Sequence, residues 1–506
     1  MRRWTVAGLL VAAAAVGAWQ LRPERFAVNA PLRQMLLGRG VAAPDRATVD
    51  ARLRAPAGFS ISLWASGLPN ARFLRFTGEG DLLLSTPRRG RVTLLLPDRD
   101  GDGRSDGRQV LLEGLDRPQG LDVHAGWLYV GESGAVVRAP FDAAARRVTG
   151  PTERVVALPS GGNHWTRTVR FGPDGLLYVS IGSSCNACVE SDPRRAALLR
   201  FQPDGSGQEI FATGLRNSEG FDWRPGTGEL YATDNGRDLL GDDIPPCELN
   251  RIVRGGFYGW PFAYGDRVPD PDLGAGHERE IAESLAPVHA FRAHNAPLGM
   301  TFVRGDALPA AYRGAAIVAL HGSWNRTRKD GYRVVSLHFG PDGIERRDLV
   351  TGFEEGGDVI GRPVDVAEGP DGALYVSDDY AGAIYRVAWV GAGVPALARR
   401  PGAPEVVAAR PAPRPRDPLA GLDPDQRQRL VDRGERIYRS HACATCHEAD
   451  HAPPGTVVKP LRGLSSRHDL EDLVAFLAAP TPPMPAVDLD PSARRALAVH
   501  LLARHP

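Results

Sequence analysis

The sequence has almost no net charge and contains few sulfur atoms. Its 61 Lys and Arg residues balance 60 Asp and Glu residues, which leaves a formal net charge of +1. This balance gives no general attraction to nucleic acid or to an anionic membrane, so no nucleic-acid partner is expected. Among 506 residues there are only 5 Cys and 4 Met. Each sulfur atom can therefore be considered individually.

A long uncharged run occurs at the N-terminus, from Trp4 to Leu21, directly after Arg2 and Arg3. This pattern predicts that residues 1–25 form an export signal. The run is also close to the roughly 20 residues that span a bilayer, so an uncleaved membrane anchor is an alternative. A buried helix of a soluble protein is the third interpretation. Either of the first two predicts a periplasmic protein, soluble or anchored to the inner membrane, where disulfides persist.

Three cysteines could form such a disulfide. Cys185 and Cys188 lie in a C-x-x-C pair followed by Val189, and Cys247 stands alone. A bond between Cys185 and Cys188 is the simplest expectation. Pairing of Cys247 with either of them remains open, because spacing does not decide connectivity.

Glycine and proline are abundant, with 58 and 43 residues, which favours tight turns and a mainly β protein. Between residues 56 and 390 a Gly-containing turn followed by a short β run recurs six times. The central residues of the runs lie 46, 49, 53, 87 and 57 residues apart and are Leu83, Tyr129, Tyr178, Tyr231, Val318 and Tyr375. This repeat predicts a six-bladed β-propeller, with an inserted loop rather than a seventh blade in the long interval. A β-sandwich or two stacked β domains would explain the strands but not the repeat.

The composition changes after the repeats. Residues 391–420 are rich in Pro, Ala and Arg without apolar periodicity, which predicts a linker. Residues 421–506 are expected to form a small all-α domain. Its first helix would begin at the N-cap Asp423 and its last helix at about Pro491.

The small domain contains a C-x-x-C-H pattern, the attachment signal for c-type haem. Cys443 and Cys446 would bond the porphyrin, and His447 would bind the iron. A zinc half-site or a small disulfide is the alternative, but zinc would need a second Cys/His pair, and no Cys follows position 446. The order of the helices resembles a class I cytochrome c, which implies Met484, in a Pro-rich loop, as the sixth iron ligand. The rival ligands are His451, His468, His500 and His505.

Several motifs follow one another along the expected propeller. They are PAGFSISLWASGLPNARFL, GGNHWTRTVRFGPDGLLYVSIG, GLRNSEGFDW, ATDNGRDLLGDDIPPCELNRI, GGFYGWP, HGSWNR and GRPVDV. Together they resemble the pyrroloquinoline quinone (PQQ)-dependent sugar dehydrogenases of the glucose/sorbosone dehydrogenase family, most closely its sorbosone dehydrogenase-like branch. The resemblance implies hydride transfer from an aldose or a related sugar or aldehyde to PQQ, with calcium as a further cofactor. Electrons would then pass to the haem c of the same chain.

The resemblance also implies roles for single residues. His164 matches the general base of the family, and a His of near-neutral pKa suits that task. A structural loop His is the alternative, and Asn163 stands where the soluble glucose dehydrogenases have an acid, which leaves the orientation of His164 open. PQQ carries three carboxylates, so its pocket needs cations and amide donors. The implied contacts are Gln119, Arg216, Asn217, Asn325, Arg326 and Arg362.

Calcium has two candidate sites. The resemblance implies one beside the quinone, on backbone oxygens of the segment Asn235, Gly236 and Arg237. A second follows from an acidic loop with oxygen ligands at the first, third, fifth and ninth places and Gly at the sixth, as in most of an EF-hand loop. Those ligands are Asp98, Asp100, Asp102 and Asp106. An acidic hairpin turn is the alternative, and calcium bound there would be structural.

Two other functions remain open. A calcium-dependent lactonase on a six-bladed propeller would use carboxylate-held calcium and water. A non-enzymatic propeller would only dock a partner while the cytochrome relays electrons. The leading interpretation, a sugar dehydrogenase, requires a small sugar as substrate and a downstream electron acceptor such as a respiratory cytochrome or oxidase.

Overall fold

The computed structural model describes residues 27–29, 40–391, 419, 421–448, 461, 464, 470–478, 484 and 489–505. The chain divides into two compact units between residues 398 and 399. The expected signal or anchor at 1–25 and almost all of the expected linker at 391–420 lie outside the described residues, as do His451 and His468. Within the described ranges, no helix is long and apolar enough to cross a membrane.

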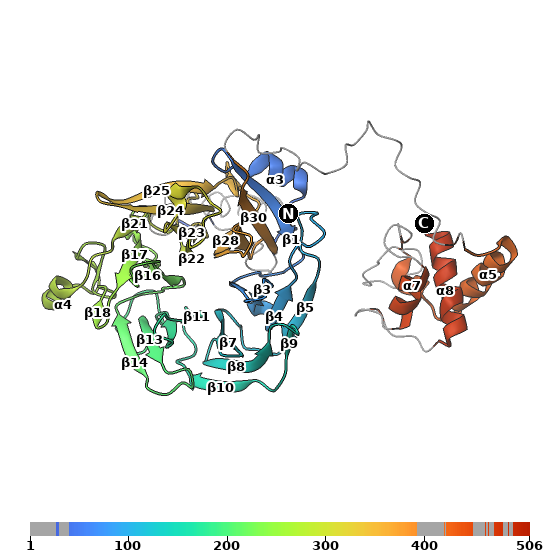
Figure 1. Ribbon diagram of the computed structural model, residues 1–506, viewed down its shortest axis with the longest axis horizontal. Coiled ribbons are helices and arrows are strands. Elements are labelled where there is room, and N and C mark those ends of the chain that lie inside the picture. Colours follow the sequence, from blue (N-terminus) through green and yellow to red (C-terminus); the bar gives the residue numbers. More distant parts are fainter. Residues whose placement is uncertain are drawn as a thin grey trace, which may run out of the picture. The chain divides into compact units, whose positions relative to one another are not determined.

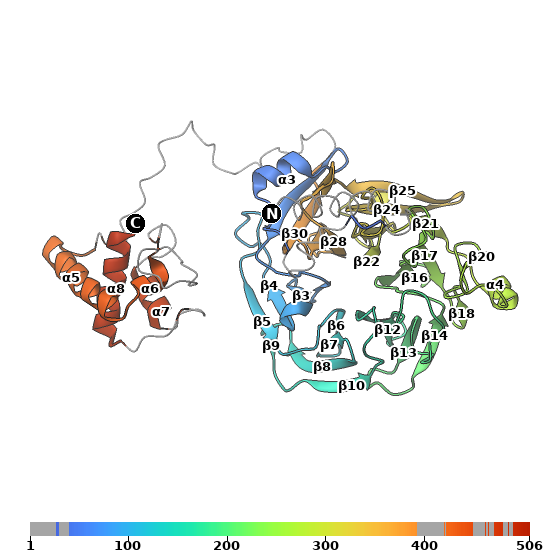
Figure 2. The same cartoon turned by 180° about the vertical axis from the view of Figure 1, so that it is seen from behind.

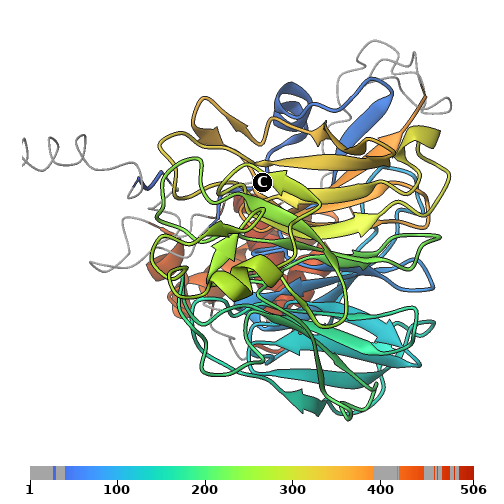
Figure 3. The same cartoon turned by 90° about the vertical axis from the view of Figure 1, so that its left-hand side faces the viewer.

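The first unit is a ring of six sheets, seen along its axis in Figure 1 and from behind in Figure 2. The six-bladed propeller expected from the repeats is therefore confirmed. The first strands of neighbouring blades contact one another, so they line the centre of the ring. In the side view the strands run between the two faces of the ring (Figure 3).

Each blade has four main strands in outward order. The first three blades are β2 (Leu74–Phe76), β3 (Leu82–Thr86), β4 (Arg91–Leu95) and β5 (Arg108–Leu112); β6 (Leu121–His124), β7 (Trp127–Glu132), β8 (Ala135–Asp142) and β10 (Glu153–Ala157); and β11 (Arg167–Phe171), β12 (Leu177–Ile181), β13 (Ala197–Phe201) and β14 (Glu209–Thr213). The last three are β15 (Phe221–Trp223), β16 (Leu230–Asp234), β17 (Cys247–Ile252) and β21 (His289–Phe291); β22 (Pro297–Phe302), β23 (Ala316–Leu320), β24 (Arg333–Gly340) and β25 (Gly343–Val350); and β28 (Pro363–Glu368), β29 (Leu374–Asp378), β30 (Ala383–Trp389) and β1 (Phe59–Ala65).

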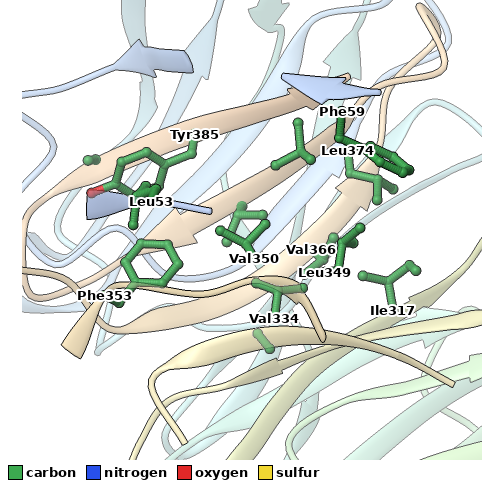
Figure 4. Close-up of a cluster of buried hydrophobic side chains, with 14 of the residues drawn as sticks. Leu53, Phe59, Ile317, Val334, Leu349, Val350, Phe353, Val366, Leu374 and Tyr385 are labelled. Atoms are coloured by element: carbon green, nitrogen blue, oxygen red, sulfur yellow. The ribbon is translucent and has the colours of Figure 1, made fainter. Parts of the chain in front are cut away.

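The outermost strand of the sixth blade comes from the beginning of the described propeller. β1 pairs antiparallel with β30, with Phe59 opposite Trp389. The Phe59 ring also meets Tyr312 of the fifth blade edge-on, with 5.2 Å between ring centroids. These side chains belong to the largest apolar cluster, which fills the space between the fifth and sixth blades (Figure 4). The two ends of the propeller sequence are therefore joined within one hydrophobic core.

Buried carboxylates connect neighbouring blades near the axis. The Asp122 carboxylate of the second blade accepts from the backbone N–H of Phe171 in the third, at 2.7 Å. Asp222 accepts from the first strand of the fifth blade, and Asp365 of the sixth blade from the backbone N–H of Leu74 in the first, both at 2.9 Å. One Asp in every second blade thus satisfies a backbone donor of the next blade, which sets the spacing around the ring.

The long interval of the repeat holds an insertion, as expected, and no seventh blade among the described residues. It contributes the short strands β18 (Gly256–Phe257), β19 (Ala263–Tyr264) and β20 (Val268–Pro269) and the helix α4 (Glu278–Glu283). β18 pairs with β14 of the third blade. Figures 1 and 2 both place α4 at the outer rim. The remaining short strands are β9 (Arg147–Val148), β26 (Glu354–Glu355) and β27 (Asp358–Val359), and the helix α3 (Arg46–Arg52) precedes β1.

The second unit is helical. It contains α5 (Pro424–Ser440), α6 (Ala444–His447), α7 (Leu470–Ala478) and α8 (Pro491–Arg504). The Asp423 side chain caps α5 by accepting from the backbone N–H of Gln426, as the sequence predicts. α5 and α8 cross closely at Gly434, where an added Cβ would lie 2.2 Å from the carbonyl oxygen of Ala496. Glycine therefore permits the close approach of the two helices.

We predict that Phe59→Ala destabilises the propeller by about 3–5 kcal/mol, because it removes a buried ring from the seam that closes the ring. Urea unfolding followed by tryptophan fluorescence measures the loss. Ser62→Ala in the same strand is the control and should change the free energy of unfolding by less than about 0.5 kcal/mol. A loss below about 1 kcal/mol for Phe59→Ala would show that closure does not depend on this packing.

Candidate active site

Equivalent positions of the six blades converge on one mouth of the central channel. Each of these positions lies three residues before the same alignment position in the innermost strand of its blade. The residues found there are Arg72, Gln119, Arg167, Glu219, Leu298 and Arg362. Hydrogen bonds join three of them across the axis. The Arg72 guanidinium donates to the Gln119 side chain at 3.1 Å and to the Glu219 carboxylate at 2.8 Å. The mouth is therefore lined by polar side chains from several blades.

Arg72 is the centre of this network and is only 6% exposed. It also forms an ion pair with Asp379 of the sixth blade, at 2.9 Å. The other oxygen of Asp379 lies 2.9 Å from Nε2 of His321. Burial alone would raise the pKa of Asp379, but the adjacent His321 and Arg72 hold it well below its usual value. Burial and the charge of Arg362 lower the pKa of His321 to about 4.

His164 lies in the loop before β11, and its ring is fixed from one side. Its Nδ1 is 2.9 Å from both the carbonyl oxygen and the hydroxyl of Ser183. Because a carbonyl only accepts, Nδ1 carries the proton and the neutral ring presents Nε2 as its acceptor. Burial, together with the nearby charge of Arg216, lowers the pKa of His164 to about 3. His164 is therefore a neutral imidazole that can receive a proton at Nε2.

Arg167 holds the loop that carries His164. Its guanidinium donates to the carbonyl oxygens of Pro159 at 2.6 Å, His164 at 3.1 Å and Thr166 at 2.7 Å. Burial lowers the pKa of Arg167 to about 10, helped by the charges of neighbouring arginines, one of which is Arg195. This loop is thus braced by a buried cation whose hydrogen-bond acceptors within the described part of the chain are all backbone oxygens.

Arg216 and Asn217 occupy the loop before β15. The buried carboxylate of Asp234, at the end of β16, accepts from the backbone N–H groups of both residues, at 3.0 and 2.6 Å. The Asn217 side chain donates to Glu219 at 3.3 Å. Asp378, at the end of β29, holds the backbone of Arg362 in the same way, at 3.0 Å. Carboxylates at strand ends therefore fix two of the expected cofactor loops.

The segment expected to hold calcium lies against Arg216. The carbonyl oxygens of Asn235 and Gly236 accept from the Arg216 guanidinium, at 3.1 and 2.9 Å. The side-chain oxygen of Asn235 is buried without a hydrogen-bond partner. Arg237 turns away and pairs with Asp270 at 2.7 Å. A calcium ion on these carbonyl oxygens would have to displace Arg216, and the unpartnered Asn235 oxygen is one ligand that could take part.

Asn325, Arg326 and Arg362 contact mainly loops of the protein itself. Asn325 accepts from the backbone N–H of Leu239 at 2.7 Å and donates to the carbonyl oxygen of Ala27 at 2.7 Å. Arg326 is 5% exposed and donates to the carbonyl oxygens of Asp242 and Ala293. Arg362 donates to the carbonyl oxygens of His321 and Gly322, at 3.1 and 2.8 Å. The first two thus brace loops, whereas the partly exposed Arg362 lies beside the network of Arg72.

The acidic loop lies between β4 and β5, outside the channel mouth. Carboxylate oxygens of Asp98, Asp100 and Asp106 lie within 4.8 Å of one another. Asp98 accepts from the backbone N–H groups of Gly101 and Gly103, at 2.7 and 2.9 Å. Asp102 is not part of the cluster and accepts from the backbone N–H of Arg104 at 2.7 Å. The structure therefore brings three of the four expected ligands together.

In the helical unit, Cys443 directly precedes α6 and His447 ends it. Cys443 and Met484 both pack against the apolar cluster of this unit. The side chain of Cys446 lies outside the described residues. His500 is 5% exposed on α8, beside the Tyr438 ring at 5.6 Å between centroids. Cys443 and Met484 thus share one core, which is the arrangement that an enclosed haem would need.

Sequence reasoning missed four residues of the mouth: Arg72, Glu219, His321 and Asp379. Two of them carried a usable signal, because Arg72 in ARFLRF and Glu219 in SEGFDW occupy the register of Gln119 in PQGLDV.

The expected disulfide is present between Cys185 and Cys188, and Cys247 is a buried free thiol.

Comparison with known proteins places the propeller in a family. A sequence model of the family described as glucose/sorbosone dehydrogenase matches residues 128–386, just over half of the chain. The chain belongs to the glucose/sorbosone dehydrogenase family. A solved structure, the PQQ domain of pyranose dehydrogenase from Coprinopsis cinerea in its holo form, has the same fold. It superposes with a TM-score of 0.58 at 24% identity, over 68% of this chain and 98% of that one.

Three curated proteins are similar to this chain in sequence. An uncharacterised protein of Borreliella burgdorferi is 36% identical over 218 residues, 42% of this chain and 56% of its own length. The aldose sugar dehydrogenase of Escherichia coli is 27% identical over 245 residues, 45% and 61% of the two chains. The PQQ-dependent pyranose dehydrogenase of Coprinopsis cinerea is 25% identical over 405 residues, 65% and 53%. The chain thus spans 53–61% of the length of these relatives.

We predict that His164 of the cofactor-free protein stays unprotonated down to about pH 4, because burial and the Arg216 charge disfavour the imidazolium. Nitrogen-15 NMR of labelled histidines, assigned with a His164→Gln variant, measures the titration. Arg216→Gln should raise the pKa of His164, since it removes the neighbouring positive charge. A pKa above 6 in the wild-type protein would contradict this environment.

Proposed function

We propose that this chain is a periplasmic PQQ- and calcium-dependent dehydrogenase of an aldose or a related sugar or aldehyde, which passes electrons to haem c in its own C-terminal unit. The observation that carries the proposal is the channel mouth, where a neutral His and several buried arginines meet in a member of the glucose/sorbosone dehydrogenase family. Two relatives support the substrate class by their names, aldose sugar dehydrogenase and PQQ-dependent pyranose dehydrogenase.

The donor set of the mouth suits a polyanionic cofactor. Among the described residues, the guanidinium groups of Arg167, Arg195 and Arg362 form no ion pair and donate only to backbone carbonyl oxygens. Buried nitrogen atoms of Arg167 and Arg195 have no hydrogen-bond partner. Uncompensated buried cations favour a bound anion, and PQQ carries three carboxylates. Arg216, Asn217, Arg362 and Gln119 are the residues that would hold it.

The residues of the chain supply the acid–base part of the reaction. When bound, PQQ would accept a hydride from the sugar, and calcium would polarise its quinone oxygen. His164 takes the proton of the sugar hydroxyl at Nε2, since Nδ1 carries a proton that it donates to the carbonyl oxygen of Ser183. After that transfer the Ser183 carbonyl oxygen still accepts from Nδ1 and stabilises the imidazolium. Ser183 thus holds His164 in the tautomer that a base requires.

Calcium beside PQQ would use oxygens of Asn235, Gly236 and the unpartnered Asn235 side chain, provided that Arg216 is drawn toward the cofactor carboxylates. The acidic loop with Asp98, Asp100 and Asp106 would hold a separate, structural ion. Oxygen ligands of this kind match the preference of calcium.

Haem c would be bonded by Cys443 and Cys446, with His447 and Met484 as the iron ligands. The shared packing of Cys443 and Met484 supports this assignment. A thioether opposite an imidazole raises the iron potential, which suits an acceptor of electrons from a quinol. The disulfide agrees with a periplasmic location, and covalently attached haem would agree with it as well. A downstream respiratory cytochrome or oxidase would reoxidise the haem.

One observation disfavours the lactonase alternative. That activity needs calcium held by free carboxylates, whereas Glu219 and Asp379 at the mouth are both paired with Arg72. The docking alternative would not require buried arginines without anionic partners at the same mouth.

The test uses the full chain with haem attached and loaded with PQQ and calcium, and a two-electron dye as acceptor. We predict that His164→Ala lowers kcat for the best aldose at least about 100-fold, because it removes the proton acceptor. PQQ affinity should stay within about threefold of wild type, since His164 is not one of its ligands. His338→Ala, on the outer part of the fifth blade, is the control. Near wild-type turnover of His164→Ala would refute the role of His164.

If the wild-type protein binds no PQQ and oxidises no sugar, the dehydrogenase proposal fails as a whole. Hydrolysis of a lactone by the calcium-loaded protein would then favour the lactonase alternative.

A further inference from the structure

A short loop that contains a disulfide contacts both His164 and Arg216. It connects β12 to β13 and contains Cys185 and Cys188, which are bonded to each other. Both cysteines are partly exposed, and Val189 beside them is 64% exposed. A small reductant in solvent can therefore reach the bond. The dehydrogenase mechanism above gives this disulfide no role.

One side of the loop holds His164. The carbonyl oxygen and the hydroxyl of Ser183 both lie within hydrogen-bond distance of Nδ1 of His164. The carbonyl oxygen of Ser184 accepts from the backbone N–H of Asn163 at 2.8 Å. The Ser183 hydroxyl also donates to the carbonyl oxygen of Cys185 at 2.7 Å. The contact that sets the tautomer of His164 is therefore linked directly to the disulfide ring.

The other side of the loop holds Arg216 through Asn186, which lies between the two cysteines. The carbonyl oxygen and the side-chain oxygen of Asn186 both accept from the Arg216 guanidinium, at 2.9 Å each. The Asn186 side-chain oxygen also accepts from the backbone N–H of Asp238 at 2.8 Å, and its amide donates to the Asp238 carbonyl oxygen at 3.0 Å. Every polar group of the Asn186 side chain thus orients Arg216 or the segment that follows Asn235.

These contacts need Asn186 in one backbone conformation. The loop has no strand pairing of its own. Its backbone is held by the bonds of Ser183 and Ser184 to Arg216 and Asn163, and beyond them by side-chain contacts and the disulfide. A covalent bond between Cys185 and Cys188 restricts the backbone conformations of the two residues between them. The disulfide therefore restricts the one residue that presents two acceptors to Arg216.

We propose that Asn186 is a positioning residue for the cofactor-binding Arg216, and that the Cys185–Cys188 disulfide holds Asn186 in place, so that cofactor affinity depends on the redox state of this bond. Reduction by a small dithiol adds two electrons and two protons, breaks the S–S bond and leaves two thiols, while the dithiol becomes a disulfide. This inference rests on the proposed function for its ligand, PQQ, but not for the coupling of the loop to Arg216.

The first experiment is a double-mutant cycle on PQQ affinity in the full chain, with calcium present. Asn186→Ala should weaken PQQ binding about tenfold, as expected for loss of a charge-assisted hydrogen bond that orients Arg216. The double variant C185S/C188S should weaken it about tenfold as well, and so should treatment of the wild type with dithiothreitol. Combining Asn186→Ala with C185S/C188S should weaken binding by much less than the product of the two effects, because both act through one residue.

Two further variants separate positioning from general stability. Asn186→Asp keeps the acceptor for Arg216 and should recover part of the affinity lost in Asn186→Ala. Gln202→Ala changes an exposed residue of the same blade and should leave affinity unchanged. Fully multiplicative effects, or unchanged PQQ affinity in C185S/C188S, would overturn the proposal.

The second experiment needs no cofactor, so it decides the coupling even if PQQ does not bind to the wild type. Hydrogen exchange of the cofactor-free protein, read by mass spectrometry, should increase in C185S/C188S over residues 159–166 and 214–238 and stay unchanged in the other blades. Unchanged exchange in both segments would show that the disulfide does not hold the site together.

Discussion

Arg72 lies buried between two carboxylates from distant blades, Glu219 and Asp379, and the shape of the channel mouth depends on this interaction. A buried cation must be paired, and removing one partner of such a pair generally costs about 3–5 kcal/mol. The network fixes the first, fourth and sixth blades relative to one another and pairs the carboxylates of Glu219 and Asp379. Among the described residues, Arg167, Arg195 and Arg362 form no ion pair, whereas Arg216 pairs with Asp238 at 3.2 Å. The mouth is thus prepared for an anionic ligand by its own ion pairs.

A neutral histidine beside buried arginines combines two requirements of the proposed chemistry. Burial and the charge of Arg216 lower the pKa of His164 and keep it unprotonated, and Ser183 keeps its proton on Nδ1. The same Ser183 donates its backbone N–H to the carbonyl oxygen of Arg216 at 2.8 Å. The proposed base and the proposed cofactor residue are therefore both held by one loop, which also contains the Cys185–Cys188 disulfide. On our proposal, acid–base chemistry and cofactor binding are coupled through these covalent and hydrogen bonds.

The sequence alone was sufficient to predict the six-bladed propeller, but it did not predict which side chains pair with one another at the channel mouth. Six blades follow from a repeat that is local in the chain, because each turn and strand is specified within about ten residues. The partners of Arg72 lie 147 and 307 residues away, and no local pattern reports such contacts. Asn325 could be matched to a cofactor residue by its motif, but its hydrogen bonds to Leu239 and Ala27 are visible only in the folded chain.

The same limit applies to the metal and haem residues. Oxygen spacing in the acidic loop predicted four ligands, yet Asp102 turns to the backbone N–H of Arg104 because a short Asx turn competes with the cluster. The C-x-x-C-H pattern is specific because covalent attachment requires those residue types in that order. The expected sixth ligand, Met484, is distant in sequence from this pattern, so it could be named only from the resemblance to a class I cytochrome c.

The most direct measurement is the visible spectrum of the oxidised full chain, with haem attached, before and after addition of a panel of aldoses. We expect reduced-haem bands to appear with at least one sugar, and only when both PQQ and calcium are bound. A haem that stays oxidised with every sugar, although PQQ and calcium are bound, would contradict the electron path from the propeller to the C-terminal unit.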